Sequence, residues 1–331
     1  MSTASAHASH TETLTRYAHR WMAMRILAPK TIELYESELR CHIIPIFGEM
    51  SLDQLGTEQI RLWYAQLVGA TSAISAAKCY RLLRAILTTA VEDGLILTNP
   101  CRVKGAGRER SKERPLLTAE QVLDVAECIE PRYRALVLLA AYGSLRRGEL
   151  LGLRRRNIDL DRAVVLVEGQ AQRITGQGRV ISSPKSDAGL RTVAVPPAVA
   201  EALRLHMQEF SGAGDDAWVF TADKGGPARE AHVRTEWNRA AADCGVPAAH
   251  LHDLRHFGAT LAAQLGATTR ELQDRLGHST TRAAMLYQHR AHSRDRDLAD
   301  RMEASLAAQI NEREGCGRLT TGTSEVDKAD Q

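Results

Sequence analysis

Apolar residues recur at helical spacing along most of the chain. Between residues 14 and 27 they fall three or four positions apart, at Tyr17, Trp21, Met24 and Leu27, which is the period of an amphipathic helix. The same spacing predicts three more helices, over residues 31–43, 58–68 and 75–92. Pro29 is expected to end the first helix, and Thr31 and Thr57 are suitable N-caps for the next two. The pattern predicts a small all-α domain over residues 12–101.

The pattern changes after residue 116, where helices and strands alternate. Thr118 and Gln121 form a capping box at the start of a helix that runs to about Cys128, and residues 132–142 predict a second, largely apolar helix. Strand-like runs follow over residues 163–168, 180–184 and 191–195, and they predict one small antiparallel sheet. Helical spacing then resumes. We expect a mixed α+β domain over residues 117–310, in a chain that is mainly α with a small antiparallel sheet.

Three segments outside these domains are polar. Residues 1–11 and 311–331 have few large apolar side chains and are expected to be disordered. Residues 102–116 carry two glutamates against six basic residues, which are Arg102, Lys104, Arg108, Arg110, Lys112 and Arg114. This stretch predicts an exposed basic linker, which is either merely soluble or lies along a phosphate backbone.

Composition narrows the class of protein. The 331 residues are 44% hydrophobic and 25% charged, ordinary values for a globular protein, and the length favours two domains. The formal net charge is only +3, so a nucleic-acid partner has to be argued from where the charges lie. No apolar run is long enough to span a bilayer, and the N-terminal residues contain no apolar stretch of the kind a secretory signal needs. Scattered cysteines without a C-x-x-C pair favour a reducing cytoplasm over a disulfide framework or a zinc site.

Two basic residues lie at turns beside regular structure. Arg146 stands just before an apolar helix, in S-L-R-R-G-E-L, where its charge opposes the helix dipole. This cost suggests a guanidinium aimed at an anion, although a pair with a nearby carboxylate is an equally good interpretation. Lys185 stands at the predicted turn between two strands, where a lysine can reach into a cleft. Taken alone, a solvated lysine is the simpler interpretation of that position.

The segment H-L-H-D-L-R-H covers residues 250–256. His252 and Arg255 are three apart on one helix face, so both can meet the same ligand. His252 and His256 are four apart, which also fits a pair of metal ligands. Phosphate binding is favoured over metal, because the H-E-x-x-H form is absent and Arg255 would place a cation beside the metal. Taken alone, however, this segment is more simply interpreted as a helix-surface cluster without any ligand.

The last segment, L-G-H-S-T-T-R-A-A-M-L-Y, covers residues 276–287. Gly277 ends one helix, His278 lies at the mouth of the next, and Tyr287 follows more than two turns along. Taken alone, a tyrosine on an amphipathic helix such as Tyr287 is usually a core aromatic. Together the segments supply two arginines, a lysine, two histidines and a tyrosine, with no acidic cluster for Mg²⁺. That set suits phosphoryl transfer without a metal.

In this order of residues the chain resembles the tyrosine recombinases, the phage integrase family. The matching positions lie between residues 117 and 300 and are Arg146, Lys185, His252, Arg255, His278 and Tyr287. Residues 14–101 are similar to the family's SAM-like core-binding domain, including P-x-F-G at 45–48 and N-P at 99–100. Ser144 stands where the family often has glycine, and we expect this to be harmless. Little sequence precedes Leu14, so we expect an N-terminal arm-binding domain to be missing or reduced.

The resemblance implies a chemistry as well as a fold. Tyr287 would attack a DNA phosphate, form a 3′-phosphotyrosyl bond and release a 5′-hydroxyl, with no metal or other cofactor. The two arginines would stabilise the charge of the transition state, and Lys185 would protonate the leaving oxygen. The two histidines would hold the phosphate, and His252 could also take the tyrosine proton. Attack by the 5′-hydroxyl of a second duplex would then exchange strands without ATP.

The same resemblance implies partners. Both domains would grip double-stranded DNA at recombination sites, and their backbone contacts would come from Lys78, Arg81, Arg84, Arg108, Arg110 and Lys112. Exchange between two duplexes requires four active sites, which implies a homotetramer on DNA at the nucleoid of the cytoplasm. A directionality factor or a host DNA-bending protein would be a further partner, and a membrane would not. An amphipathic helix over residues 294–310, with Leu298, Met302, Leu306 and Ile310, would dock on a neighbouring subunit or fold onto its own.

Several alternatives share part of this interpretation. A Xer-type resolvase or a transposon recombinase would have the same active site as the integrase of a phage, a prophage or another mobile element. A type IB topoisomerase shares the chemistry but relaxes DNA without pairing two sites. Outside that chemistry, the chain could be a DNA-binding protein with a vestigial site, or a metallohydrolase built on His252 and His256.

Overall fold

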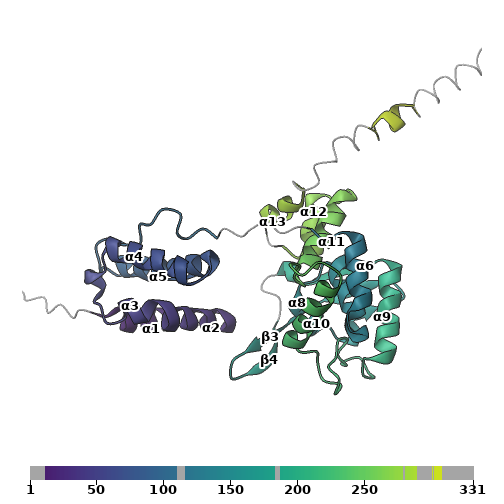
Figure 1. Ribbon diagram of the computed structural model, residues 1–331, viewed down its shortest axis with the longest axis horizontal. Coiled ribbons are helices and arrows are strands. Elements are labelled where there is room, and N and C mark those ends of the chain that lie inside the picture. Colours follow the sequence, from purple (N-terminus) through teal and green to yellow (C-terminus); the bar gives the residue numbers. More distant parts are fainter. Residues whose placement is uncertain are drawn as a thin grey trace, which may run out of the picture. The chain divides into compact units, whose positions relative to one another are not determined.

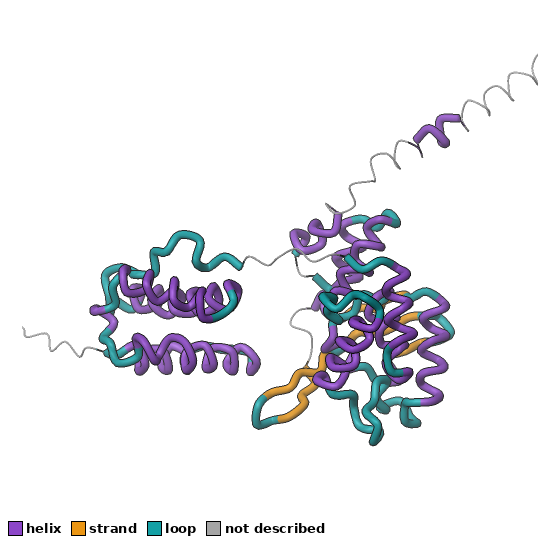
Figure 2. Tube along the Cα trace, in the orientation of Figure 1, coloured by secondary structure: helices purple, strands orange, loops and turns teal. Residues whose placement is uncertain are grey.

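The computed structural model describes residues 12–109, 116–182, 187–278, 280–288, 300 and 302–307. Backbone contacts divide the chain into two compact units, one of residues 1–114 with 173–180 and one of residues 115–172 with 181–331. Helices dominate and strands are few (Figure 2). None of the described helices is long and apolar enough to cross a membrane.

The first unit has a helical core (Figure 1). Its helices are α1 (Leu14–Ala23), α2 (Pro29–Glu38), a π-helical turn (Leu39–Ile43), α3 (Ile44–Phe47), a 3₁₀ turn (Leu52–Gln54), α4 (Thr57–Ala70) and α5 (Ala73–Glu92). Tyr17 and Trp21 of α1 are buried, and their polar atoms bond to the C-terminal end of α5, at Asp93 (2.7 Å) and Thr89 (3.0 Å). Buried aromatic side chains thus carry both the packing and the polar anchoring of this core.

The ends of the first helices differ from the sequence prediction. The first helix ends at Ala23 rather than Leu27, because Met24 and Ile26 are exposed and have no core to pack against. Pro29 begins α2 instead of separating two helices, since its missing N–H lies where a first helical turn needs none. Thr31 is therefore inside α2 and is not its cap. Thr57 is likewise the first residue of α4, whose N-cap is Gly56.

The second unit is built of helices around a large apolar core. They are α6 (Ala119–Cys128), α7 (Pro131–Tyr142), α8 (Arg147–Gly152), α9 (Pro197–Glu209), α10 (Glu230–Asp243), α11 (Asp253–Gln264), α12 (Thr269–Leu276) and α13 (Thr281–Gln288), with 3₁₀ turns at Arg155–Asn157 and Asp187–Gly189. The predicted capping box is confirmed, because Thr118 and Gln121 bond each other's backbone N–H at 3.1 and 3.0 Å. Helix α7 is buried along nearly its whole length and packs against α6, α9 and α11.

The strands form two small sheets rather than one. A three-stranded antiparallel sheet has the order β1 (Ile158–Asp159), β2 (Val164–Val167) and β5 (Arg191–Ala194), and β3 (Gln170–Ile174) pairs separately with β4 (Gly178–Ser182). The prediction that the run 180–184 joins the other two runs was therefore wrong. Val165 and Val193 pair and are buried, whereas β3 and β4 are mostly half-buried and are closed by a turn with positive φ at Gly176 and Gly178. The sequence did not predict β3 as the partner of β4, because the polar side chains of β3 give no apolar pattern.

Candidate active site

The site begins at the turn that joins α7 to α8. Gly143 ends α7, and Ser144 follows in the left-handed region at φ 55° with its side chain fully buried. That backbone costs a non-glycine residue roughly 1–2 kcal/mol, so the serine has a conformational cost that the sequence alone did not show. Gly258 of α11 faces the turn, where an added Cβ would collide with the backbone of Ala141 and with Ser144 Oγ. Close contact between α7 and α11 therefore shapes the turn that presents Arg146.

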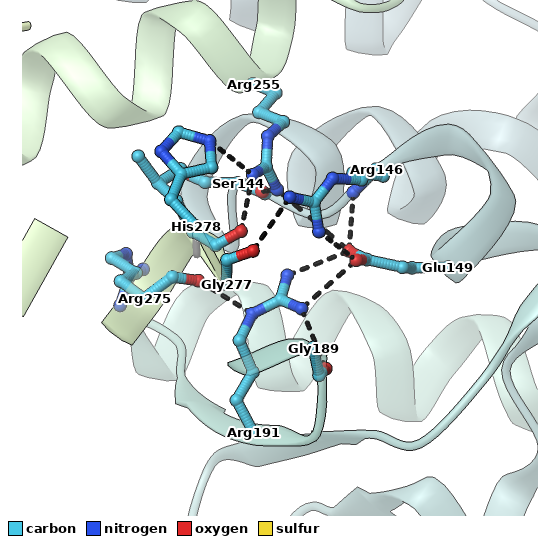
Figure 3. A network of polar contacts seen from close by, with 10 residues as sticks. Ser144, Arg146, Glu149, Gly189, Arg191, Arg255, Arg275, Gly277 and His278 are labelled. Carbon is cyan, nitrogen blue, oxygen red and sulfur yellow. Dashed lines mark hydrogen bonds and ion pairs between the residues drawn. The ribbon is translucent and has the colours of Figure 1, made fainter. Parts of the chain in front are cut away.

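One buried carboxylate organises the residues after this turn (Figure 3). Glu149, 4% exposed, accepts bonds from the backbone N–H of Arg146 (2.7 Å) and from its Nη1 (2.8 Å). Arg191 of β5 donates both terminal nitrogens to it, at 2.8 and 3.1 Å. Burial raises the pKa of Glu149, but the bonds and charge of Arg191 outweigh that effect and hold the pKa below its usual range. The carboxylate is thus ionised and fixes two guanidinium groups.

Arg255 is the most deeply buried of these arginines, at 3% exposed. Its Nη1 donates to the carbonyl of Ser144 and its Nη2 to that of Leu276, both at 2.5 Å, and Nη2 lies 3.3 Å from His278 Nε2. Burial, with the charge of Arg146 next, lowers the pKa of Arg255 to about 9, so the guanidinium stays charged at neutral pH. Arg146 Nη2 donates to the carbonyl of Gly277 at 2.9 Å. Both arginines therefore hold the turn that carries His278.

Arg191 is a member of this cluster that the sequence did not single out. Its side chain is 6% exposed, and its Nε donates to the carbonyl of Arg275 at 2.8 Å. The available signal was a lone basic residue opening a short apolar strand, in R-T-V-A. In the described cluster, three guanidinium groups of Arg146, Arg191 and Arg255 surround the single carboxylate of Glu149. The surplus of positive charge suits an anion.

Tyr287, on α13, packs among alanine and leucine side chains of α11, α12 and α13. Tyr287 is 5% exposed and belongs to a cluster with Ala259, Ala263, Leu272, Leu276 and Ala284. Its ring stacks with that of His278, at 6.5 Å between centroids and 18° between planes. His256 Nδ1 lies 2.9 Å from the Tyr287 hydroxyl. Burial, and then the charge of Arg255, lowers the pKa of His278 to about 4, so this histidine is neutral at pH 7.

The structure brings together five of the six positions expected from the sequence: Arg146, His252, Arg255, His278 and Tyr287. Lys185 lies outside the described residues. His252 is the N-cap of α11, exposed, with its ring 5.0 Å from that of His256 one turn later. His256 was considered from the sequence only as a metal ligand. No three metal-ligating side chains come together in the part of the chain that the structure describes, so that alternative lacks a third ligand there.

The residues expected at the DNA backbone are distributed over the helical unit. On α5, Lys78 is half-buried, and Arg81 and Arg84 are exposed. Arg81 pairs with Glu109 (2.5 Å) and donates to the carbonyl of Gly107 (3.0 Å). Arg108 is exposed, and Arg110 and Lys112 lie outside the described residues. In the expected C-terminal helix, Met302 and Leu306 are exposed, while Leu298 and Ile310 lie outside the described residues.

Comparison with known proteins gives consistent matches. Residues 115–294 match the phage integrase family, and residues 13–68 match the phage integrase N-terminal SAM-like domain. The chain is 38% identical over 287 residues to a putative prophage phiRv2 integrase of Mycobacterium tuberculosis, covering 86% of this chain and 76% of the relative. It is also 38% identical over 295 residues to the integrase of Mycobacterium phage L5, covering 88% and 78%.

Solved structures share the fold at lower identity. The Tn1549 transposon integrase in complex with transposon right end DNA has a TM-score of 0.77 at 20% identity, covering 86% of this chain and 99% of that one. A lambda integrase dimer bound to a COC′ core site has a TM-score of 0.65 at 20% identity, covering 84% and 95%. These likenesses confirm the predicted fold class, mainly α with a small amount of antiparallel sheet.

Proposed function

The chain belongs to the phage integrase family of tyrosine recombinases, and we propose from this premise how its own residues cut and rejoin DNA. It is a site-specific DNA recombinase, and the relatives named integrase favour a phage, prophage or mobile-element integrase over a resolvase. The observation that carries the proposal is the meeting of Arg146, Arg255, His278 and Tyr287 from separate stretches of sequence.

Arg146 and Arg255 bind the scissile phosphate. The side chain of Arg146 is 36% exposed, so its guanidinium can reach an incoming oxygen, while Arg255 supplies a desolvated charge behind it. Because carbonyls and Glu149 already hold both groups, little reorganisation is needed when charge builds up on the phosphate. Neutral His278 and the exposed His252 add hydrogen bonds to the nonbridging oxygens.

Tyr287 attacks the phosphorus and becomes joined to the 3′ end, and the 5′-oxygen leaves as a hydroxyl. Lys185, by the match of its sequence position, donates the proton to that oxygen. The phosphotyrosyl bond conserves the energy of the phosphodiester, so a second 5′-hydroxyl can reverse the step without ATP. No step of this scheme calls for a metal ion.

Membership of the family also leads us to propose how the chain contacts DNA and assembles on it. Basic residues of the helical unit and linker would contact the DNA backbone: Lys78, Arg81, Arg84, Arg108, Arg110 and Lys112. Exchange between two duplexes uses four active sites, which supports a homotetramer on DNA, and a lambda integrase tetramer bound to a Holliday junction has a related fold. A directionality factor or a host DNA-bending protein would bias the direction, and the place of action is the nucleoid.

A nicked suicide substrate tests the assignment of Tyr287. The wild-type chain should give a protease-sensitive covalent adduct on an SDS gel, with and without EDTA. Tyr287→Phe removes only the attacking oxygen, so it should keep DNA binding and give no adduct. An adduct of equal yield from the Phe variant would remove Tyr287 from the role of nucleophile.

A further inference from the structure

We propose that His256 is the group that accepts the proton of Tyr287 during cleavage and returns it during rejoining. The inference deepens the proposed function, because it takes Tyr287 as the nucleophile. His256 projects from α11 toward α13, and its Nδ1 lies 2.9 Å from the Tyr287 hydroxyl. This separation of the two heavy atoms is within the hydrogen-bond reach that a general base needs.

The neighbouring histidines are placed for other tasks. His252 is exposed at the start of α11, and its ring centre lies 5.0 Å from that of His256, almost at right angles. His278 stacks on the Tyr287 ring and turns its Nε2 toward Arg255 at 3.3 Å. Both rings thus lie toward the phosphate-binding groups or open solvent, whereas His256, half-buried, meets the phenol itself.

The proton transfer balances within the proposed reaction. As the bond from Tyr287 Oη to phosphorus forms, the phenol proton passes to His256 Nδ1. The bond from phosphorus to O5′ breaks, and O5′ takes a proton from Lys185. In rejoining, protonated His256 returns its proton to the departing Tyr287 oxygen. A free imidazole has a pKa near 6.5 and a phenol near 10, so the transfer becomes favourable only as the new bond draws charge from the oxygen.

A purely structural role for His256 has to be separated from this one. A buried tyrosine hydroxyl needs a hydrogen-bond partner in any protein, and His256 would supply it without taking a proton. Asparagine places an amide near the position of Nδ1, so His256→Asn keeps a partner for the phenol but has no basic nitrogen. His256→Ala removes both. Exposed His250, in the same segment, provides His250→Asn as a matched control.

The experiment measures single-turnover cleavage of a nicked suicide substrate by the full chain. General-base catalysis contributes about 10²–10⁴-fold, so we expect both His256 variants to lose about 10²-fold or more. His250→Asn should cleave at the wild-type rate. Added imidazole should restore cleavage by His256→Ala at least about tenfold, because a free base can fill the vacated space. A 5′-bridging sulfur in the substrate, which bypasses the leaving-group acid, should not rescue either His256 variant.

The dependence of cleavage on pH gives a second readout. Among the described residues, the groups that face His256 include His252 one turn earlier on α11, His278 after α12 and Tyr287 on α13, with Arg255 adjacent in the chain. Wild-type cleavage should fall in acid as His256 becomes protonated and can no longer accept. The pKa of His278 lies near 4, so His278 titrates at a lower pH than the expected fall in cleavage. Cleavage by His256→Asn should show no such fall between about pH 5 and 8.

The inference would be overturned if His256→Asn cleaved at the wild-type rate. It would also be overturned if a slow His256 variant kept the fall of cleavage in acid and were not rescued by imidazole. In either case His256 would be only a structural partner of Tyr287. Tyr287→Phe, run in parallel, reports on the proposed function separately. If that variant still forms the adduct, the nucleophile itself is wrongly assigned. If it forms none while His256→Asn behaves as wild type, only the role of His256 fails.

Discussion

The arginine side and the tyrosine side of the site are held in different ways. On the arginine side, Arg146, Arg191 and Arg255 share the buried Glu149, and two of them, Arg146 and Arg255, bond to backbone carbonyls at Ser144 and at residues 276–277. On the tyrosine side, Tyr287 packs among alanines and leucines and meets His256 through its hydroxyl. Charge that stabilises a transition state has to be fixed in advance. Changes on the arginine side should therefore cost both fold stability and rate, and changes at the Tyr287 hydroxyl should cost rate alone.

The largest expected effect is that of Glu149→Gln. Losing this charge leaves the buried guanidinium groups uncompensated, which costs about 3–5 kcal/mol in the free energy of unfolding. Because the pKa of Glu149 is lowered by folding, its contribution is present above the usual glutamate pKa and is lost as the pH falls through the lowered value. The gap between variant and wild type, measured by urea unfolding, should be full at pH 7 and shrink below about pH 4.

A surface pair provides the control for that measurement. Glu230 pairs with Arg147 at 2.9 Å, and both side chains are nearly half exposed. Glu230→Gln should cost less than about 1 kcal/mol at pH 7. An equal loss from both variants would mean that the arginine side is no more dependent on its carboxylate than an ordinary surface pair.

The next effect is on rate, at Arg255→Lys. A lysine keeps the charge but loses the planar fork that bonds the Ser144 and Leu276 carbonyls together. Cleavage should slow by about 10²–10³-fold, the usual cost of losing one preorganised donor. Single-turnover cleavage at saturating DNA measures it. Near-wild-type cleavage would make Arg255 a structural residue and not a phosphate ligand.

A smaller effect is expected where α7 and α11 touch. Gly258→Ala would force a methyl group into the backbone of Ala141 and into Ser144 Oγ, and overpacking of this kind costs about 1–3 kcal/mol. Since the displaced turn carries Arg146, cleavage should fall as well. Gly226 has open space around it, so Gly226→Ala should leave both thermal unfolding and cleavage unchanged. Equal stability of the two variants would show that the turn tolerates movement.

The smallest effect is a gain, at Ser144→Gly. Glycine relieves the left-handed backbone and removes a buried hydroxyl that has no partner among the described atoms, while it adds freedom to the unfolded chain. We expect a net gain of about 0.5–1 kcal/mol in thermal unfolding with unchanged cleavage. Ser144→Ala keeps the strained backbone and should gain less. A loss of stability in the glycine variant would mean that the serine side chain contributes packing.

Sequence reasoning reached the residues whose type and order are distinctive. The capping box at Thr118 and the grouping of Arg146, Arg255 and Tyr287 were predictable because each depends on local spacing or on a recognisable order. Arg191 was not, because its partner Glu149 lies 42 positions away in the chain. His256 was weighed from the sequence only as one of a possible pair of metal ligands, which ranked below phosphate binding. Its contact with Tyr287 spans 31 positions, which local spacing does not reveal. Strand β3 was missed because Gln170, Gln172 and Arg173 interrupt any apolar pattern along it.

The positive φ of Ser144 is a second feature that could not be predicted from the sequence. A serine at this position does not indicate a positive φ, because its size and polarity are ordinary for a turn. Only the backbone geometry reveals why glycine would be favoured there. The geometry of a turn depends on the helices that enter and leave it, here α7 and α8, and on Gly258 of α11 packed across it.

Mapping the covalent bond to one residue tests the central claim most directly. The wild-type chain is trapped on a nicked suicide substrate, digested with protease and nuclease, and the peptide that carries the nucleotide is sequenced by mass spectrometry. The mechanism predicts a 3′-phosphotyrosyl link at Tyr287 and at no other residue. A nucleotide on a different side chain, or cleavage that leaves no covalent adduct, would contradict it.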